Sequence, residues 1–356
     1  MRLLAALTTT LLLLHASADG QTATDAARPL AGVAQRAAQF PRLRSLLVSH
    51  RGEQVFEYYA RGVGPNRLAN IKSASKSVIS ALVGIAIDRH LLPGVREPIA
   101  AYFPDLQRAT DARRTITIED LLTMRSGLET TSNRNYGAWV TSPNWVRYVL
   151  TRPLIAEPGT MMQYSTGSTH LLSAILARVS GRTTRAFAQQ ALATPLGFTI
   201  APWPTDPQGI YFGGNDMLLT PRQMLEFGEL YLNHGTRGGR QVIPAAWIST
   251  TCVPRTTSRF DAGREYGYGW WIDEVGGHTA CYAWGYGGQY ILVFEDLQTV
   301  VVATSSTTTG IEGSSRAQNR PATSTRSAND FGCATVTPAF VFDSIFQPSS
   351  GWASRT

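Results

Sequence analysis

Ser73 and Lys76 are the residues of this chain whose types and spacing are best suited to covalent chemistry. Lysine occurs only twice, at Lys72 and Lys76, among 32 basic residues. An arginine stays protonated in a protein, whereas a buried lysine can lose its proton and act as a base. On a helix that begins near Ser73, Lys76 lies on the same face as the serine, so its amine reaches the hydroxyl. Burial and a nearby cation would lower the pKa of the Lys76 amine and let it activate the serine. Lys72 is the candidate cation, and a Lys72 side chain that points to solvent is the alternative.

The serine and lysine alone do not establish catalysis, because this spacing is common by chance and a solvated lysine on a helix is the ordinary alternative. Tyr164 adds a second group. It follows a Pro-Gly turn at residues 158–159, which places a phenol on a loop near a helix start. Beside Lys76 the phenol can pass a proton to the leaving group as a general acid and base. The alternative for Tyr164 is ordinary packing.

A third segment is rich in glycine and lies near the last strands. Residues 283–289 are Ala-Trp-Gly-Tyr-Gly-Gly-Gln. Glycines on an edge strand let a substrate carbonyl approach the backbone. Amides of this segment, together with the amide of Ser73, could then hold the oxyanion of a tetrahedral intermediate. A plain glycine-rich hairpin is the alternative, and this segment alone does not decide between the two.

The first 18 residues have the features of a secretory signal: Arg2, an apolar run and a small-x-small end at Ala18. No cysteine follows for a lipid anchor, and no later run reaches the ~20 apolar residues of a membrane helix. We therefore expect cleavage near Ala18 and a periplasmic or secreted protein without a membrane anchor. The formal net charge of +7 is spread as single arginines, which argues against nucleic acid as a partner.

Three cysteines, Cys252, Cys281 and Cys333, allow one disulfide and one free thiol in an exported protein. The sequence leaves the pairing open. Cys252 with Cys281 is preferred because both lie in the denser part of the chain. No histidine motif supports a cysteine nucleophile, the histidines lack metal-ligand spacing, and no Gly-x-Ser-x-Gly elbow is present. Neither a metal site nor a Ser-His-Asp lipase is predicted.

The pattern of elements predicts strands at both ends of the chain and helices between them. A hairpin is expected at residues 43–49 and 54–59, and a helix from Ser73 to near His90. Later helices are expected to start near 118 and to cover 169–179, 221–232 and 244–249, and strands to cover 266–272, 280–285, 288–294 and 299–304. A final helix is expected at 338–346. This order predicts an α/β (α+β) fold, with an antiparallel sheet closed by both chain ends and a mostly helical insertion at about 95–255.

One large domain is expected. Residues 19–40 form a tail leading into a helix, 41–346 the domain, and 347–356 a C-terminal tail. The Ser, Thr, Arg and Gly-rich residues 305–327 are expected to form a loose surface loop within that domain.

Taken together, these motifs resemble the serine hydrolases of the class C β-lactamase and penicillin-binding-protein superfamily, within them the esterase and 6-aminohexanoate-dimer hydrolase branch. The resemblance covers about residues 43–304 and includes further blocks at 116–128, 212–217 and 266–271. It implies the β-lactamase-like fold and hydrolysis without metal or cofactor. It makes Ser73 the acylated nucleophile, Lys76 its base, Tyr164 the proton relay, and the backbone amides of Ser73 and Tyr286 the oxyanion hole. Whether Lys76 or Tyr164 is the formal base stays open.

Two departures from the family pattern bear on the substrate. The second motif ends in Thr166 instead of asparagine, and the third is Ala-Trp-Gly instead of Lys-Thr-Gly, which removes the cation that would bind a β-lactam or peptide carboxylate. Trp284 and Gly285, with Tyr136 and Thr166, are the expected pocket residues. We expect an esterase or amidase acting on a small-molecule ester or amide, with no obligate protein partner. A β-lactamase or D-Ala-D-Ala carboxypeptidase, or a non-catalytic cell-wall sensor, is the alternative.

Overall fold

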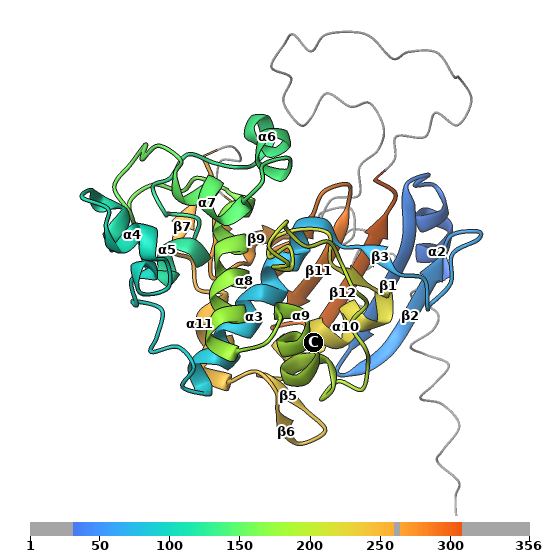
Figure 1. Cartoon of the computed structure of the whole chain (residues 1–356). Helices are drawn as coiled ribbons and strands as arrows, with labels where there is room; N and C mark the ends of the chain where they lie inside the picture. The colour runs from blue at the N-terminus through green and yellow to red at the C-terminus, as the bar shows by residue number, and fades with distance from the viewer. Residues whose placement is uncertain (1–30, 260–263, 308–356) are drawn as a thin grey trace, which may run out of the picture.

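The structure is a computed structural model that describes residues 31–259 and 264–307. Its centre is an antiparallel sheet of eight strands in the order β2-β1-β12-β11-β10-β9-β8-β7 (Figure 1). The strands are β1 (Leu43–His50), β2 (Glu53–Tyr59), β7 (Thr256–Thr257), β8 (Glu265–Tyr266), β9 (Trp271–Val275), β10 (His278–Gly285), β11 (Gln289–Phe294) and β12 (Thr299–Ser305). Since β1 pairs with β12 along its length, both ends of the described chain build the sheet, as predicted.

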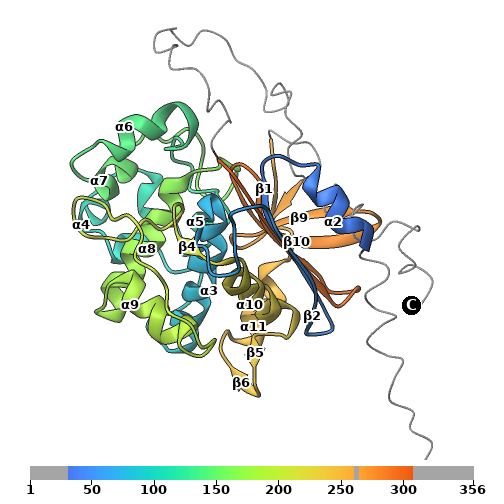
Figure 2. The ribbon, with the colours of Figure 1, turned by 90° about the vertical axis from the view of Figure 1, so that its right-hand side faces the viewer.

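The sheet is buried on both faces because alternate residues of its central strands point to opposite sides. Val300 and Val302 of β12 pack toward the helices α3 (Ser75–Asp88) and α10 (Pro221–Leu232), whereas Val301 packs toward α2 (Ala31–Ala38). Figure 2 shows α2 alone on one side of the sheet and the larger group of helices on the other. The expected fold class, a large antiparallel sheet flanked by helices, is confirmed.

The helices between β2 and β7 form the second half of the molecule. Its two central members are α3 and α8 (Thr166–Ser180), and both are buried over most of their length. The shorter helices are α4 (Pro104–Gln107), α5 (Ile118–Leu122), α6 (Tyr136–Val140), α7 (Trp145–Leu150), α9 (Thr184–Ala188) and α11 (Ala245–Thr251). Single turns lie at Lys72–Ala74, Ile99–Ala101, Ala112–Thr115, Asn133–Asn135 and Gln189–Ala193, and the two-residue pairs are β3 (Ala69–Asn70) with β4 (Leu218–Leu219) and β5 (Thr236–Arg237) with β6 (Arg240–Gln241). No helix in the described part of the chain is both long and apolar enough to cross a membrane.

Most expected elements are present, and one is wrong. The N-terminal hairpin and the helix at 221–232 are confirmed. Residues 266–272, expected as one strand, are instead the end of β8, a turn and the start of β9. Gly269 has a left-handed φ of 76°, and the Ser77 hydroxyl of α3 donates to its carbonyl at 2.7 Å. The turn therefore packs against α3, a long-range contact that strand periodicity does not show.

The preferred disulfide is confirmed: Cys252 and Cys281 are bonded, with Cα atoms 5.9 Å apart, and join the end of α11 to β10. Several predictions lie outside the described residues. They concern the signal sequence, Cys333, the loop beyond residue 307 and the helix at 338–346.

Candidate active site

Ser73 lies in a single 3-10 turn, Lys72–Ala74, that leads directly into α3. Lys72 has a left-handed φ of 50°, and its N–H donates to Asn70 Oδ1 at 3.0 Å. The Ser75 hydroxyl donates to the Lys72 carbonyl at 2.6 Å. These bonds hold the turn from both sides, so a partly exposed serine is presented at a fixed position.

Lys76 is the chemical centre of the site. Its side chain is 1% exposed, and its Nζ lies 3.1 Å from Ser73 Oγ, 2.6 Å from the Gly214 carbonyl oxygen and 3.3 Å from Thr166 Oγ1. Burial lowers the pKa of the amine to about 7, and the charge of Asp216 only partly opposes this. A neutral amine can donate to Gly214 and Thr166 while its lone pair accepts the Ser73 proton.

The expected effect of Lys72 on Lys76 is wrong. Lys72 Nζ forms an ion pair with Asp216 Oδ1 at 2.8 Å, and Asn70 Nδ2 donates to the same oxygen at 2.8 Å. Asp216 raises the pKa of Lys76, so the neighbouring pair works against the shift and burial alone causes it. The sequence could not reveal this, because Asp216 is 144 positions from Lys72.

Tyr164 completes the group. Lys76 Nζ lies 4.9 Å from the centre of the Tyr164 ring, which stacks on Trp271 at 5.6 Å. Burial raises the pKa of Tyr164 to about 12, and a hydrogen bond with Ser73 opposes the shift. The phenol is therefore neutral near pH 7 and is chemically suited to relay a proton; its role as the relay stays a prediction.

Thr166, an expected pocket residue, lies beside the lysine amine. It is 5% exposed and contacts Lys76 Nζ; its place in the substrate pocket stays a prediction. Ser132 supports it, because the Ser132 hydroxyl accepts from the Thr166 N–H at 2.9 Å and lies 3.0 Å from its Oγ1. Sequence reasoning missed Ser132. The run Thr-Thr-Ser at 130–132 was its signal, since three consecutive hydroxyls here are all buried.

A second segment missed by sequence reasoning runs from Gly214 to Asp216. Gly214 accepts from Lys76, Asp216 pairs with Lys72, and Asn215 Nδ2 donates to the Tyr136 hydroxyl at 2.9 Å. Tyr136, an expected pocket residue, is half-buried. Its hydrogen bond with Asn215 joins it to the segment that also contacts Lys76. Burial raises the pKa of its phenol. The family resemblance includes residues 212–217 but assigns them no role in the site.

Gly285 brings the third motif against the serine turn. A Cβ at this position would lie 2.1 Å from the Ile71 carbonyl oxygen, so only glycine allows this approach. The Tyr286 side chain, at 67% exposure, points into solvent. The role expected of Tyr286 depends on its backbone amide, and that role stays a prediction.

Trp284 is half-buried and packs edge-on against Trp271 at 5.9 Å, which in turn stacks on Tyr164. The guanidinium of Arg264 lies 5.2 Å from the Trp284 ring and is ion-paired to Asp273 at 3.4 Å. A cation is therefore present beside the third motif, although the motif itself has none. The absence of the Lys-Thr-Gly lysine therefore does not leave this part of the site without a positive charge. Arg264 lies outside the motif in sequence and was missed for that reason.

The residues the structure describes hold no group of three or more histidines, cysteines, aspartates or glutamates that could bind a metal ion. The site instead joins a serine, an amine with a lowered pKa and a neutral phenol. Such a set can carry out nucleophilic catalysis with proton relay.

Comparison with known proteins places this geometry in context. The model of the beta-lactamase family matches residues 30–322. A curated relative, the 6-aminohexanoate-dimer hydrolase of Paenarthrobacter ureafaciens, is 25% identical over an alignment of 252 positions that covers 64% of this chain. The match spans 63% of that relative's length.

Two solved structures show the same fold at lower identity. EstCE1, a hydrolase with promiscuous acyltransferase activity, is 18% identical with a TM-score of 0.66, covering 80% of this chain and 94% of its own. A D-stereospecific amidohydrolase from Streptomyces is 16% identical with a TM-score of 0.59, covering 79% and 92%.

Proposed function

Because the chain belongs to the beta-lactamase family, we propose that it is a serine hydrolase that cleaves a small-molecule ester or amide through an acyl-enzyme at Ser73. The observation that carries this proposal is the Lys76 amine, which is buried, has a pKa of about 7 and lies 3.1 Å from the serine hydroxyl. A base whose pKa is close to the working pH is the most efficient proton acceptor. This favours Lys76 as the formal base.

The proposed acylation balances within the residues of the site. The Ser73 proton passes to Lys76 Nζ as Oγ bonds to the substrate carbonyl carbon, and the carbonyl electron pair moves onto oxygen. The amides of Ser73 and Tyr286 hold this oxyanion. When the intermediate collapses, the bond to the leaving group breaks, and that group takes the proton from Lys76 through the Tyr164 phenol. Water then hydrolyses the acyl-serine by the same relay in reverse.

Ester or amide cleavage is favoured by the relatives' own descriptions, which name a 6-aminohexanoate-dimer hydrolase, a hydrolase with promiscuous acyltransferase activity and a D-stereospecific amidohydrolase. A second candidate, β-lactamase or D-Ala-D-Ala carboxypeptidase action, is supported by one observation. The Arg264 guanidinium beside Trp284 is a cation that could bind a substrate carboxylate.

We also propose that the protein is exported. The signal-like residues 1–18 support this, and so does the Cys252–Cys281 disulfide, because disulfides persist in oxidising compartments.

The proposal is tested by exposing the purified protein and its Ser73→Ala variant to a fluorophosphonate and measuring intact mass. Turnover of p-nitrophenyl butyrate and nitrocefin is measured beside it. We expect one adduct that the variant lacks, with the butyrate cleaved and nitrocefin spared.

Each other outcome assigns a different function. Rapid nitrocefin cleavage would favour the β-lactamase candidate and Arg264 as its carboxylate ligand. No adduct and no turnover would reject catalysis and leave a non-catalytic, sensor-like binding protein.

A further inference from the structure

A buried histidine and aspartate lie next to the site but outside the catalytic group. His170 of α8 and Asp206 both have side chains that are 0% exposed, and His170 Nε2 lies 3.1 Å from Asp206 Oδ2. The rings of Trp139, Trp145 and Phe212 surround the imidazole, with centroids 5.8, 5.4 and 6.0 Å away. A pair that is buried this completely acts through the backbone it holds, since it has no access to solvent or substrate.

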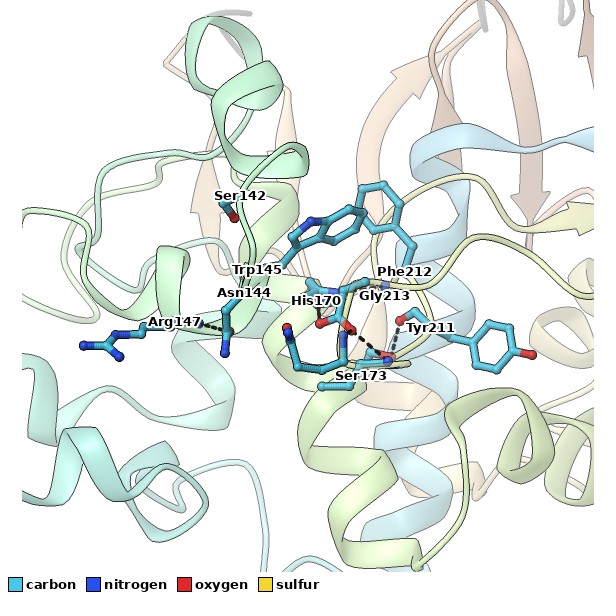
Figure 3. A network of polar contacts seen from close by, with 12 residues as sticks. Ser142, Asn144, Trp145, Arg147, His170, Ser173, Tyr211, Phe212 and Gly213 are labelled. Carbon is cyan, nitrogen blue, oxygen red and sulfur yellow. Dashed lines mark hydrogen bonds and ion pairs between the residues drawn. The ribbon is translucent and has the colours of Figure 1, made fainter.

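The hydrogen bonds of His170 define its tautomer. The Gly213 N–H points at Nδ1, 3.4 Å away, so Nδ1 is the unprotonated acceptor (Figure 3). Nε2 then carries the proton and donates to Asp206. The other Asp206 oxygen accepts from the Gln208 and Ile210 N–H groups at 2.9 and 2.8 Å. The pair thus joins α8, the 206–210 turn and Gly213.

Gly213 and Gly214 are packed against α8 without room to spare. A Cβ on Gly213 would lie 2.2 Å from the Thr169 carbonyl oxygen, and one on Gly214 would lie 2.4 Å from Thr169 Oγ1. One residue after the Gly213 N–H, the Gly214 carbonyl oxygen accepts from Lys76 Nζ at 2.6 Å. The histidine is therefore one residue away from the carbonyl that holds the lysine.

We propose that the His170–Asp206 pair positions the Lys76 amine by holding Gly213 and Gly214 against α8. This inference rests on the proposed hydrolase function. It makes His170 and Asp206 positioning residues, since neither touches Ser73 or the reacting atoms. Loosening the glycines would move the Gly214 carbonyl away from Nζ and admit water, so the amine would lose part of the burial that lowers its pKa.

Because the chain has only two lysines, the pKa of the Lys76 amine can be measured directly. In protein labelled with 15N at the lysine amines, Lys72 and Lys76 give two signals, and the titration of Lys76 is followed by NMR without any substrate. Asp216 and Tyr164, the other titratable groups that face Lys76, stay in place in every variant. The variants are His170→Gln, which keeps a donor near Nε2, His170→Asn, which keeps an acceptor near Nδ1, and Asp206→Asn.

Ser173→Ala is the matched control. Ser173 belongs to the same buried network, and its hydroxyl donates to the Tyr211 carbonyl at 2.7 Å. Its Cβ lies against Gly213, and alanine keeps that Cβ. We expect the pKa of Lys76 to rise by about one unit in His170→Gln and Asp206→Asn. We expect less change in His170→Asn and none in Ser173→Ala. In the variants whose Lys76 pKa rises, the acidic limb of kcat/KM for p-nitrophenyl butyrate shifts to higher pH by the same amount. Their kcat falls about tenfold at nearly constant KM.

Folded variants whose Lys76 titration matches that of the wild type would overturn the proposal. So would unfolding of all three His170 and Asp206 variants beside a folded control, because the pair would then be structural only. If the wild type hydrolyses nothing, the proposed function fails, but the NMR titration still decides whether the pair positions the amine.

A different observation carries a second inference. A cavity of about 370 Å³ is lined by residues 67–70, which lead into the serine turn, and by three exposed arginines, Arg44, Arg61 and Arg67. No aspartate or glutamate is among the described residues that line it, and none of the three arginines forms an ion pair within 31–259 and 264–307. The cavity is thus a concentration of uncompensated positive charge.

The cavity adjoins the catalytic turn through Asn70. Asn70, which precedes Ser73 by three residues in the chain, lines the cavity and also donates to Asp216. Its other wall is the end of β12 at Ser305, which accepts from Gln289 Nε2 at 2.7 Å, next to the end of β10. An anionic group in the cavity would therefore lie along the same sheet edge as the third motif.

We infer that the cavity binds a carboxylate of the substrate, distant from the bond that is cleaved. Guanidinium groups bind carboxylates with paired hydrogen bonds. This inference rests on the proposed function and narrows its substrate class to esters or amides of acids that carry a second, free carboxylate.

The test compares mono-p-nitrophenyl esters of dicarboxylic acids of increasing length with neutral esters of the same length. We expect the double variant Arg61→Ala/Arg67→Ala to lower kcat/KM about tenfold for acidic esters of one length range and to leave neutral esters unchanged. Arg114→Ala/Arg240→Ala, which removes equal charge elsewhere on the surface, is the control.

Equal losses for acidic and neutral esters, or equal losses in the control, would overturn the inference. If no ester is cleaved at all, calorimetric titration with the free dicarboxylates separates the two questions. Binding that the arginine variant loses supports the cavity, and no binding to the wild type rejects it.

Discussion

At the scale of single residues, the chemistry depends on a lysine whose pKa is lowered by folding, so that its amine is partly unprotonated near pH 7. The ordinary pKa of the Lys76 amine, 10.5, falls to about 7 in the fold. The unfolded chain therefore binds the proton more tightly than the folded one. This destabilises the folded state fully below about pH 7, and the free energy of unfolding rises as pH rises from about 7 to 10.5, where the penalty disappears. The activated base is kept at a cost in stability.

Replacing Lys76 by methionine should separate these two effects. We expect Lys76→Met to lower kcat/KM for p-nitrophenyl butyrate at least ~100-fold, because the general base is removed. The same variant should gain about 2 kcal/mol in the free energy of unfolding at pH 7, since no amine has to be buried uncharged. Urea unfolding measures the change in stability, and ester hydrolysis at the same pH measures the change in kcat/KM. A variant that is inactive and also less stable would contradict the stability part of this argument.

The pH profile is a second consequence at this scale. Lys76 must be neutral to accept the serine proton, so we expect kcat/KM to fall below pH about 7. Tyr164 has a pKa of about 12, so it should cause no loss of activity up to about pH 10. The measurement is kcat/KM for the butyrate ester between about pH 5 and about pH 10. An acidic limb well below 6, or an alkaline limb near 9, would argue against this assignment of base and phenol.

At the scale of elements, the site exists where the end of β10 meets the turn before α3. Gly285 allows this contact because its missing side chain leaves room for the Ile71 carbonyl. The strand end and the serine turn must stay together for the two expected oxyanion amides to converge.

Gly285→Ala should therefore impair catalysis more than folding. Its Cβ would lie 2.1 Å from the Ile71 carbonyl oxygen, so the strand or the turn must shift. We expect a loss of about 2 kcal/mol in stability and a more than tenfold slower reaction with the fluorophosphonate. Gly64→Ala, where a Cβ meets nothing within 4 Å, is the control. An alanine variant that reacts as fast as the wild type would mean that this approach is not needed for acylation.

At the scale of the whole molecule, the sheet and the helical half are held together by buried contacts across α3 and by the disulfide between α11 and β10. The disulfide closes a loop of 29 positions, far from the serine in sequence. Its main effect is to restrict the unfolded chain.

We expect Cys252→Ser/Cys281→Ser to lower the free energy of unfolding by about 3 kcal/mol and to leave kcat at 25 °C within about twofold. Urea unfolding with and without reductant gives the first value, and ester turnover gives the second. A large loss of kcat with little change in stability would show instead that the bridge shapes the site.

Local patterns in the sequence were sufficient for a large part of this molecule. The alternation of apolar residues predicted the strands at both ends, and the spacing of Ser73 and Lys76 predicted their contact, because both depend on residues close in the chain. The same holds for the helix at Pro221–Leu232, which has a capping threonine and an N-terminal proline.

The tertiary structure decided what holds those residues in place. Ser132, Gly214, Asn215 and Asp216 reach the site from loops 59 to 143 positions away from Ser73, and Arg264 reaches Trp284 from outside its motif. Their roles depend on which loops pack together, and no periodicity or spacing encodes that packing. For the same reason the sequence predicted burial as a cause of the lowered pKa of Lys76 but wrongly added Lys72, which was only its neighbour in the chain and is ion-paired to Asp216 in the fold.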